Sequence, residues 1–154
     1  MRRKDRELTN KADIEDVLKR AFVCHLGLVD GDQAYVVPMN YAYEDGHIYL
    51  HGAKEGRKID LIRKNNKVCF QMELFNPEIV KGNDKPCDWG TSFRSVIGTG
   101  IARFLETSEE KERGLGIIVG KEDERTFSFP EKMLNVTAVI DIEILEMTGK
   151  VAND

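Results

Sequence analysis

A cationic segment with two glycines, HGAKEGRKID, begins at His51. It follows a predicted strand and opens a predicted helix, whose first turn presents unpaired backbone N–H groups and a partial positive charge. Gly52 and Gly56 let the backbone approach a ligand closely. Its basic residues are Lys54, Arg57 and Lys58. This pattern predicts a site for a phosphate monoester, and a solvated basic helix start is the open alternative. The spacing is not that of a P-loop.

A second segment, VVPMNY, contains a proline inside a strand-like run. Pro38 has no N–H to donate to a sheet, so it indicates an edge position or a break in strand pairing. Free backbone groups at such a break could meet the polar edge of a planar ligand, and Asn40 could hydrogen-bond a heterocycle. An edge proline that only prevents aggregation is the alternative.

The third segment, CDWGTSFRSVIGTG, holds the only tryptophan, Trp89. A tryptophan in a loop can stack on an aromatic ligand, fill a subunit interface or pack in the core. Arg94 and Ser95 could contact an anion or lie at the surface. The residues alone leave these alternatives open.

Composition excludes several classes of protein. The formal net charge is −4, without the basic excess that nucleic-acid binders use. The cysteines Cys24, Cys69 and Cys87 form neither a disulfide framework nor a C-x-x-C pair, so we expect no metal site. No apolar run is long enough for a transmembrane span or resembles a signal peptide. We therefore expect a cytoplasmic protein without membrane contact.

The elements that must position these segments are mostly strands. We expect helices over Asn10–Arg20 and Gly56–Asn65 and from Thr107 to about Val119, where a capping box begins. We expect strands over Phe22–Leu28, Tyr35–Tyr43, Ile48–His51, Val68–Leu74, Phe93–Leu105 and Thr137–Met147. The first three strands should form a meander through turns at Asp30-Gly31 and Asp45-Gly46.

Three further features complete this prediction. Phe75 to Gly90 reads as a long polar loop, and Gly98 and Gly100 suggest a bulge or bend in the strand that follows. In the last strand Asp141 should face away from Ile140 and Ile142. Lys121 to Leu134 has no clear assignment. Six mostly antiparallel strands with few helices predict a mainly β protein, a small β-barrel.

The chain resembles the pyridoxamine phosphate oxidase-like flavoproteins, and among them the branch related to nitroimidazole-resistance proteins. It shares with them, in one order, the segments VPMNY, a DG hairpin, YLHGAKEGRKID, KVCF, CDWGTSFRSVIGTG and a closing IDIEILEMTGK. The resemblance implies a six-stranded antiparallel split barrel of the FMN-binding type, one domain over residues 1–154. It also implies a homodimer with the cofactor at the subunit interface.

The resemblance also assigns roles to residues. Those along the isoalloxazine ring would be Val37, Pro38, Met39 and Asn40, followed along the ring and ribityl chain by His51, Gly52 and Ala53. The phosphate would be held by Arg57 and Lys58. The residues that approach from the other subunit or close the site would be Trp89, Ser92, Arg94 and Ser95.

The implied function is an FMN-dependent oxidoreductase that reduces small electron-poor compounds, for example nitro-aromatics. The donor would be NADH or NADPH, met transiently, since no G-x-G-x-x-G motif predicts a stable dinucleotide site. His51 would relay a proton or hydrogen-bond the cofactor. FAD in place of FMN stays open. The C-terminal extension of true pyridoxamine phosphate oxidases is missing, so that activity is not expected. The alternatives are a non-catalytic module that binds or senses flavin, haem or a deazaflavin, and a barrel with no cofactor.

Overall fold

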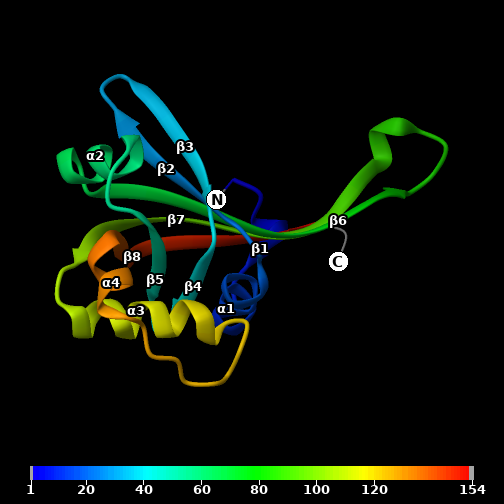
Figure 1. Ribbon diagram of the computed structural model, residues 1–154. Helices are drawn as coiled ribbons and strands as arrows, with labels where there is room; N and C mark the ends of the chain where they lie inside the picture. The colour runs from blue at the N-terminus through cyan, green and yellow to red at the C-terminus, as the bar shows by residue number, and fades with distance from the viewer. Residues whose placement is uncertain (1, 153–154) are drawn as a thin grey trace.

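An antiparallel sheet of eight strands dominates the computed structural model, which describes residues 2–152 (Figure 1). Its strands are β1 (Glu7–Leu8), β2 (Cys24–Asp30), β3 (Gln33–Met39), β4 (Tyr41–Glu44), β5 (His47–Ala53), β6 (Lys67–Lys81), β7 (Trp89–Leu105) and β8 (Thr137–Ala152). Its helices are α1 (Lys11–Arg20), α2 (Arg57–Lys64), α3 (Ser108–Gly120) and α4 (Glu131–Val136), with short 3-10 turns at Lys4–Arg6 and Pro86–Asp88. The mainly β, antiparallel prediction is confirmed, with two strands more than expected.

The strand order is β3-β2-β6-β7-β8-β5-β4, with β1 beside β8. Both predicted hairpins form: Gly31 has φ 66° in the β2–β3 turn, while Asp45 and Gly46 have φ 47° and 85° in the β4–β5 turn. The predicted three-stranded meander is wrong, because its middle strand is two separate strands. The run Tyr35–Tyr43 breaks at Asn40, and β3 and β4 stand at opposite ends of the strand order. Turn residues fix which neighbours pair locally, whereas β5 takes its second partner, β8, from far along the chain.

A long hairpin of β6 and β7 replaces the predicted loop over Phe75–Gly90. The strands stay paired out to Lys81 and Trp89 and project from the rest of the sheet (Figure 1). The register shifts between Phe75 and Ile79, on either side of Pro77, because proline cannot donate to the ladder. This segment therefore forms a β-arm, which we define as residues 75–91.

The predicted bulge in β7 is confirmed. The pairing of β7 with β8 shifts register between Thr99 and Gly100. A side chain at Gly98 would collide with the ring of Phe70 and with the carbonyl of Glu146. Only glycine fits this approach of the two strands.

Side-chain caps begin two of the helices where the sequence predicted them. Asn10 Oδ1 accepts from Ala12 N–H (3.0 Å) at the start of α1, and the capping box of Thr107 and Glu110 opens α3. The unassigned stretch after α3 runs as a loop into the short α4. No helix in residues 2–152 has both the length and the apolar character needed to cross a membrane.

Side chains on both faces of β8 are buried. Ile140 and Ile142 join the main core with Leu50 and Phe70, while Val139 joins a smaller cluster under α3 and α4. Because helices cover its second face, Asp141 is only 1% exposed. The prediction that Asp141 faces away from the two isoleucines holds, and its surroundings are buried.

Candidate functional site

The His51 segment forms a strand-to-helix junction. β5 ends at Ala53, and α2 begins at Arg57 after Gly56, whose φ of 115° and ψ of 166° suit only glycine. No side chain caps α2, and its first backbone hydrogen bonds are donated by Ile59 and Asp60. The N–H groups of the first two helical residues therefore stay available for an anion.

Lys58 folds back over this junction. A Cβ placed on Gly52 would lie 3.1 Å from Lys58 Nζ, so the ammonium rests against the bare glycine backbone. Within residues 2–152, no carboxylate forms an ion pair with Lys58. A half-buried cation without a carboxylate next to free N–H groups suits a phosphate.

Arg57, the neighbouring cation, points elsewhere. Its Nε and Nη2 donate to Asp30 Oδ2 at 3.0 and 2.7 Å, and its guanidinium lies 4.6 Å from the ring centre of Tyr35. Asp30 already neutralises it at the β2–β3 hairpin. The two cations predicted to hold phosphate therefore have different surroundings.

The proline-containing segment runs along the end strand of the sheet. β3 pairs with β2 alone on the strand path, with Pro38 opposite His25. Met39 is buried and Val37 packs against the main core, whereas Pro38 and Asn40 are exposed. The two exposed positions are those a ligand could reach in this chain.

A cavity of about 410 Å³ joins two of the predicted segments; we call it the ring cavity. Asn40 and Tyr41 line it from the β3–β4 break, and His51 lines it from β5. The opposite wall is the end of α3 at Ile118 and Val119, together with Lys121 just after the helix. His51 has no side-chain hydrogen bond within the described residues, so its ring nitrogens are free to contact a ligand.

Sequence reasoning missed this helical wall. Phe22, the first residue of the predicted strand Phe22–Leu28, also lines the ring cavity and is 72% exposed. The end of α3 gave no local signal, because its contribution depends on where the chain returns across β4 and β5.

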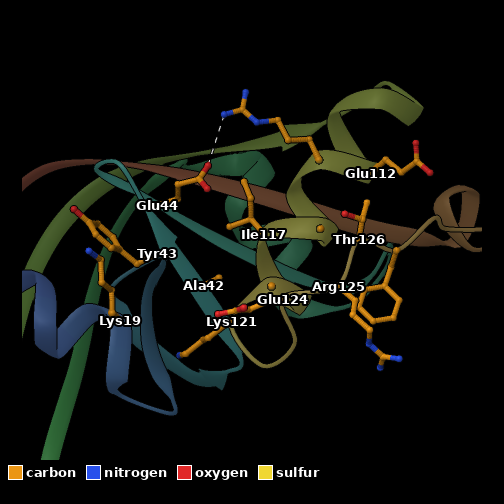
Figure 2. Close-up of a pocket in the computed structure, with 14 residues that line it drawn as sticks. Lys19, Ala42, Tyr43, Glu44, Glu112, Ile117, Lys121, Glu124, Arg125 and Thr126 are labelled. Carbon is orange, nitrogen blue, oxygen red and sulfur yellow. Dashed lines mark ion pairs between the residues drawn. The ribbon is translucent and has the colours of Figure 1, made fainter.

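A larger cavity of about 780 Å³ lies beside the ring cavity, and we call it the outer cavity. β4, α3 and residues 121–127 line it (Figure 2). Lys121 lines both cavities. The stretch that had no assignment from sequence thus closes one side of a cavity.

The remaining predicted site residues lie apart from the ring cavity. Ser92 and Arg94 line a hollow of about 400 Å³ at the base of the β-arm, and Ser95 follows them on β7. Trp89 lines a further hollow of about 440 Å³, where its Nε1 donates to Asn83 O at 2.7 Å. None of these four lines the ring cavity of its own chain.

The other two histidines each have a partner on a neighbouring strand. His25 Nδ1 lies 2.9 Å from Gln71 Oε1 on the adjacent strand. His47 Nδ1 lies 2.8 Å from Asp141 Oδ1, and Arg103 Nε donates to Asp141 Oδ2 at 3.0 Å. Strand pairing over long sequence distances creates these contacts, so local sequence could not reveal them.

A model of the pyridoxamine 5'-phosphate oxidase family matches residues 10–151. The chain belongs to this family. The family resemblance seen in the ordered motifs is confirmed. No curated protein matches the chain.

Solved structures of similar proteins add to this assignment. A candidate 5-nitroimidazole antibiotic resistance protein from Bacteroides thetaiotaomicron is 32% identical, with a TM-score of 0.83 over 94% of this chain and 86% of that one. The flavocytochrome Anf3 from Azotobacter vinelandii is 22% identical, with a TM-score of 0.85 over 100% of this chain and 72% of that one. An FAD-binding protein from Mesorhizobium loti is also 22% identical, with a TM-score of 0.71 over 96% and 98%. The last two, at this identity, show that the fold is shared.

Proposed function

We propose that this protein binds FMN and uses it to reduce small electron-poor compounds, nitro-aromatics among them, with NADH or NADPH as a transient donor. Family membership supports a flavin. The 32%-identical relative described as a candidate 5-nitroimidazole resistance protein supports the substrate class.

The observation that carries the proposal is the Lys58 ammonium over Gly52 beside the uncapped start of α2. These groups fit a phosphate monoester in both charge and hydrogen-bonding direction. The ring cavity, about 410 Å³, is lined by His51 and Asn40 and has room for a flat heterocycle. The residues present therefore fit the cofactor.

When bound, the flavin would supply the electron transfer, while the protein supplies binding, orientation and electrostatics. Lys58 and the N–H groups of α2 would anchor the phosphate. Asn40 would hydrogen-bond the polar edge of the ring. His51 would give or take a proton at its free ring nitrogen, as an imidazole can serve as a general acid or base.

Two further parts of the proposal concern the identity of the flavin and the assembly of the chains. FAD is the alternative to FMN, since relatives that share the fold are described as FAD-binding. A homodimer would bring the β-arm of one chain to the ring cavity of the other. It would then supply the four predicted residues that a single chain keeps apart: Trp89, Ser92, Arg94 and Ser95.

An absorption spectrum of the purified protein, followed by anaerobic addition of NADH or NADPH, tests the proposal. We expect a flavin band that bleaches with the donor and returns when a nitro-aromatic acceptor is added. Mass spectrometry of the released cofactor separates FMN from FAD. A flavin band that no donor bleaches would instead mean a binding or sensing module. A colourless protein that ignores added FMN would overturn the flavin assignment.

A further inference from the structure

The outer cavity has a flat wall made of helix backbone. Gly116 and Gly120 lie one turn apart on α3, and both line the cavity. A Cβ added to either glycine would meet no atom within 4 Å, so the space beside them is open. Ile117 and Ala42 add apolar surface to this wall (Figure 2). Phe127 lines the cavity from the loop. Such a wall suits the face of an aromatic ring.

Most charges around the outer cavity are already used. Arg113 Nη2 lies 3.8 Å from Glu44 Oε2, and Arg125 is paired with Asp123. Glu112 Oε1 accepts from Phe129 N–H at 3.3 Å. These contacts account for the groups involved without a ligand.

Lys121 is different because neutral groups hold it. Its Nζ donates to the carbonyl oxygen of Ala21 at 2.6 Å and lies 3.9 Å from the ring centre of Tyr41. Burial lowers the pKa of Lys121, while Glu122 acts in the opposite direction. A partly desolvated ammonium without a close ion pair gains more from an incoming anion than a solvated one does.

We propose that the outer cavity binds an aromatic carboxylate, with its ring against Gly116 and Gly120 and its carboxylate on Lys121. Lys121 also lines the ring cavity, so the bound molecule would lie next to the proposed flavin. The further step, that this carboxylate is the electron-accepting substrate, rests on the proposed function. The binding of an aromatic carboxylate is inferred from the cavity alone.

Calorimetric titration of the full-length protein with 2-naphthoate, with and without FMN, tests the inference. 2-Naphthamide is the matched neutral probe. We expect 2-naphthoate to bind about tenfold more tightly, because only the carboxylate forms a charge-assisted hydrogen bond. Equal affinity for the two probes, or no binding of either, would overturn the inference.

Two variants with opposite effects on charge locate the site. Lys121→Met keeps the apolar stem and should weaken 2-naphthoate about tenfold while leaving 2-naphthamide unchanged. Glu124→Gln removes a carboxylate that lines the cavity and should tighten 2-naphthoate about two- to threefold. An unchanged dissociation constant in Lys121→Met would place the ligand elsewhere. Circular dichroism checks that both variants fold.

A second pair of variants tests the wall without changing a charge. Gly116→Ala and Gly116→Phe both replace a helical glycine beside open space, and only phenylalanine projects a ring into the cavity. We expect Gly116→Phe to abolish binding and Gly116→Ala to stay within about threefold of the wild type. Binding that survives Gly116→Phe contradicts the inference.

The same titrations separate this inference from the proposed function. If 2-naphthoate binds in the expected pattern to a protein that never binds flavin, the cavity inference stands and the oxidoreductase proposal fails. If the protein binds and reduces flavin but shows no such pattern, the cavity inference alone fails.

Discussion

The neighbouring cations Arg57 and Lys58, in the first turn of α2, differ in whether they can bind a ligand. Lys58 rests over Gly52 and forms no ion pair with a carboxylate of the described residues. Arg57 donates two hydrogen bonds to Asp30, and its guanidinium lies over the ring of Tyr35. A phosphate would gain a charge-assisted hydrogen bond from Lys58 at once. It would have to compete with Asp30 for Arg57. Of this pair, Lys58 is therefore open to a phosphate, while Arg57 is committed to the β2–β3 hairpin.

This difference predicts unequal effects of two alanine substitutions. Lys58→Ala should weaken FMN about ten- to hundredfold, since a hydrogen bond to a charged group contributes about 1.5–3 kcal/mol. Arg57→Ala should weaken it less. Neither should change the affinity for riboflavin, which lacks the phosphate. Fluorescence-quenching titrations measure all four constants, and equal losses for FMN and riboflavin would remove Lys58 from the phosphate site.

At this scale, sequence identified the residues that lie in one local segment and missed those that come together through the fold. The glycine-spaced junction and Asn40 could be read directly, because turn and helix-start chemistry is local. Lys121 and Phe22 line the same ring cavity as Asn40, yet nothing in their neighbourhood marks them. The Asp30 partner of Arg57 was hidden for the same reason.

At the scale of elements, one buried carboxylate links three strands. Asp141 on β8 receives His47 Nδ1 from β5 at 2.8 Å, and from β7 it receives Arg103 Nε and Nη2 at 3.0 and 2.8 Å. Arg103 Nη1 also reaches Glu110 of the α3 capping box at 3.4 Å. The contacts thus connect the strand that carries His51 to the helix that walls the ring cavity.

Removing this charge should destabilise the fold measurably. Asp141→Asn takes a charged acceptor from two donors, and we expect a loss of about 1–3 kcal/mol in the free energy of unfolding. For a chain of this size that lowers Tm by about 2–10 °C. Glu143→Gln is the matched control, since Glu143 is exposed on the same strand. Thermal unfolding followed by circular dichroism measures both, and equal Tm values for the two variants would mean that the contacts contribute little.

Elements were predictable where their signals are short. Asn10, Thr107 and the two DG turns each placed a boundary within about two residues, in line with the usual accuracy of caps and turns. The β-arm was not predictable, because its two strands pair outside the core and their sequence has no apolar alternation. The break at Asn40, which separates β3 from β4, was also not predictable from local sequence, since strand order depends on contacts distant in sequence.

At the scale of the whole molecule, the β-arm is unusual for an exposed hairpin. Its large apolar residues Phe75, Ile79, Val80 and Trp89 are each 39–58% exposed. These residues lie on both strands of the arm, where it projects from the rest of the sheet (Figure 1). Apolar surface of this kind commonly marks an interface. It supports the proposed homodimer, in which Trp89 and Ser92 would reach the ring cavity of the partner subunit.

A charge on the arm should therefore break the dimer and weaken the cofactor together. We expect Ile79→Asp to shift the mass measured by analytical ultracentrifugation from dimer to monomer, because an aspartate would have to be desolvated at the interface. FMN affinity should fall about tenfold in the same variant, since residues of the partner subunit no longer reach the site. Met133→Asp, which places the same charge at an exposed position on α4, should change neither quantity. If Ile79→Asp lost the dimer but kept its FMN affinity, the β-arm would serve assembly alone, and each chain would hold its cofactor without help.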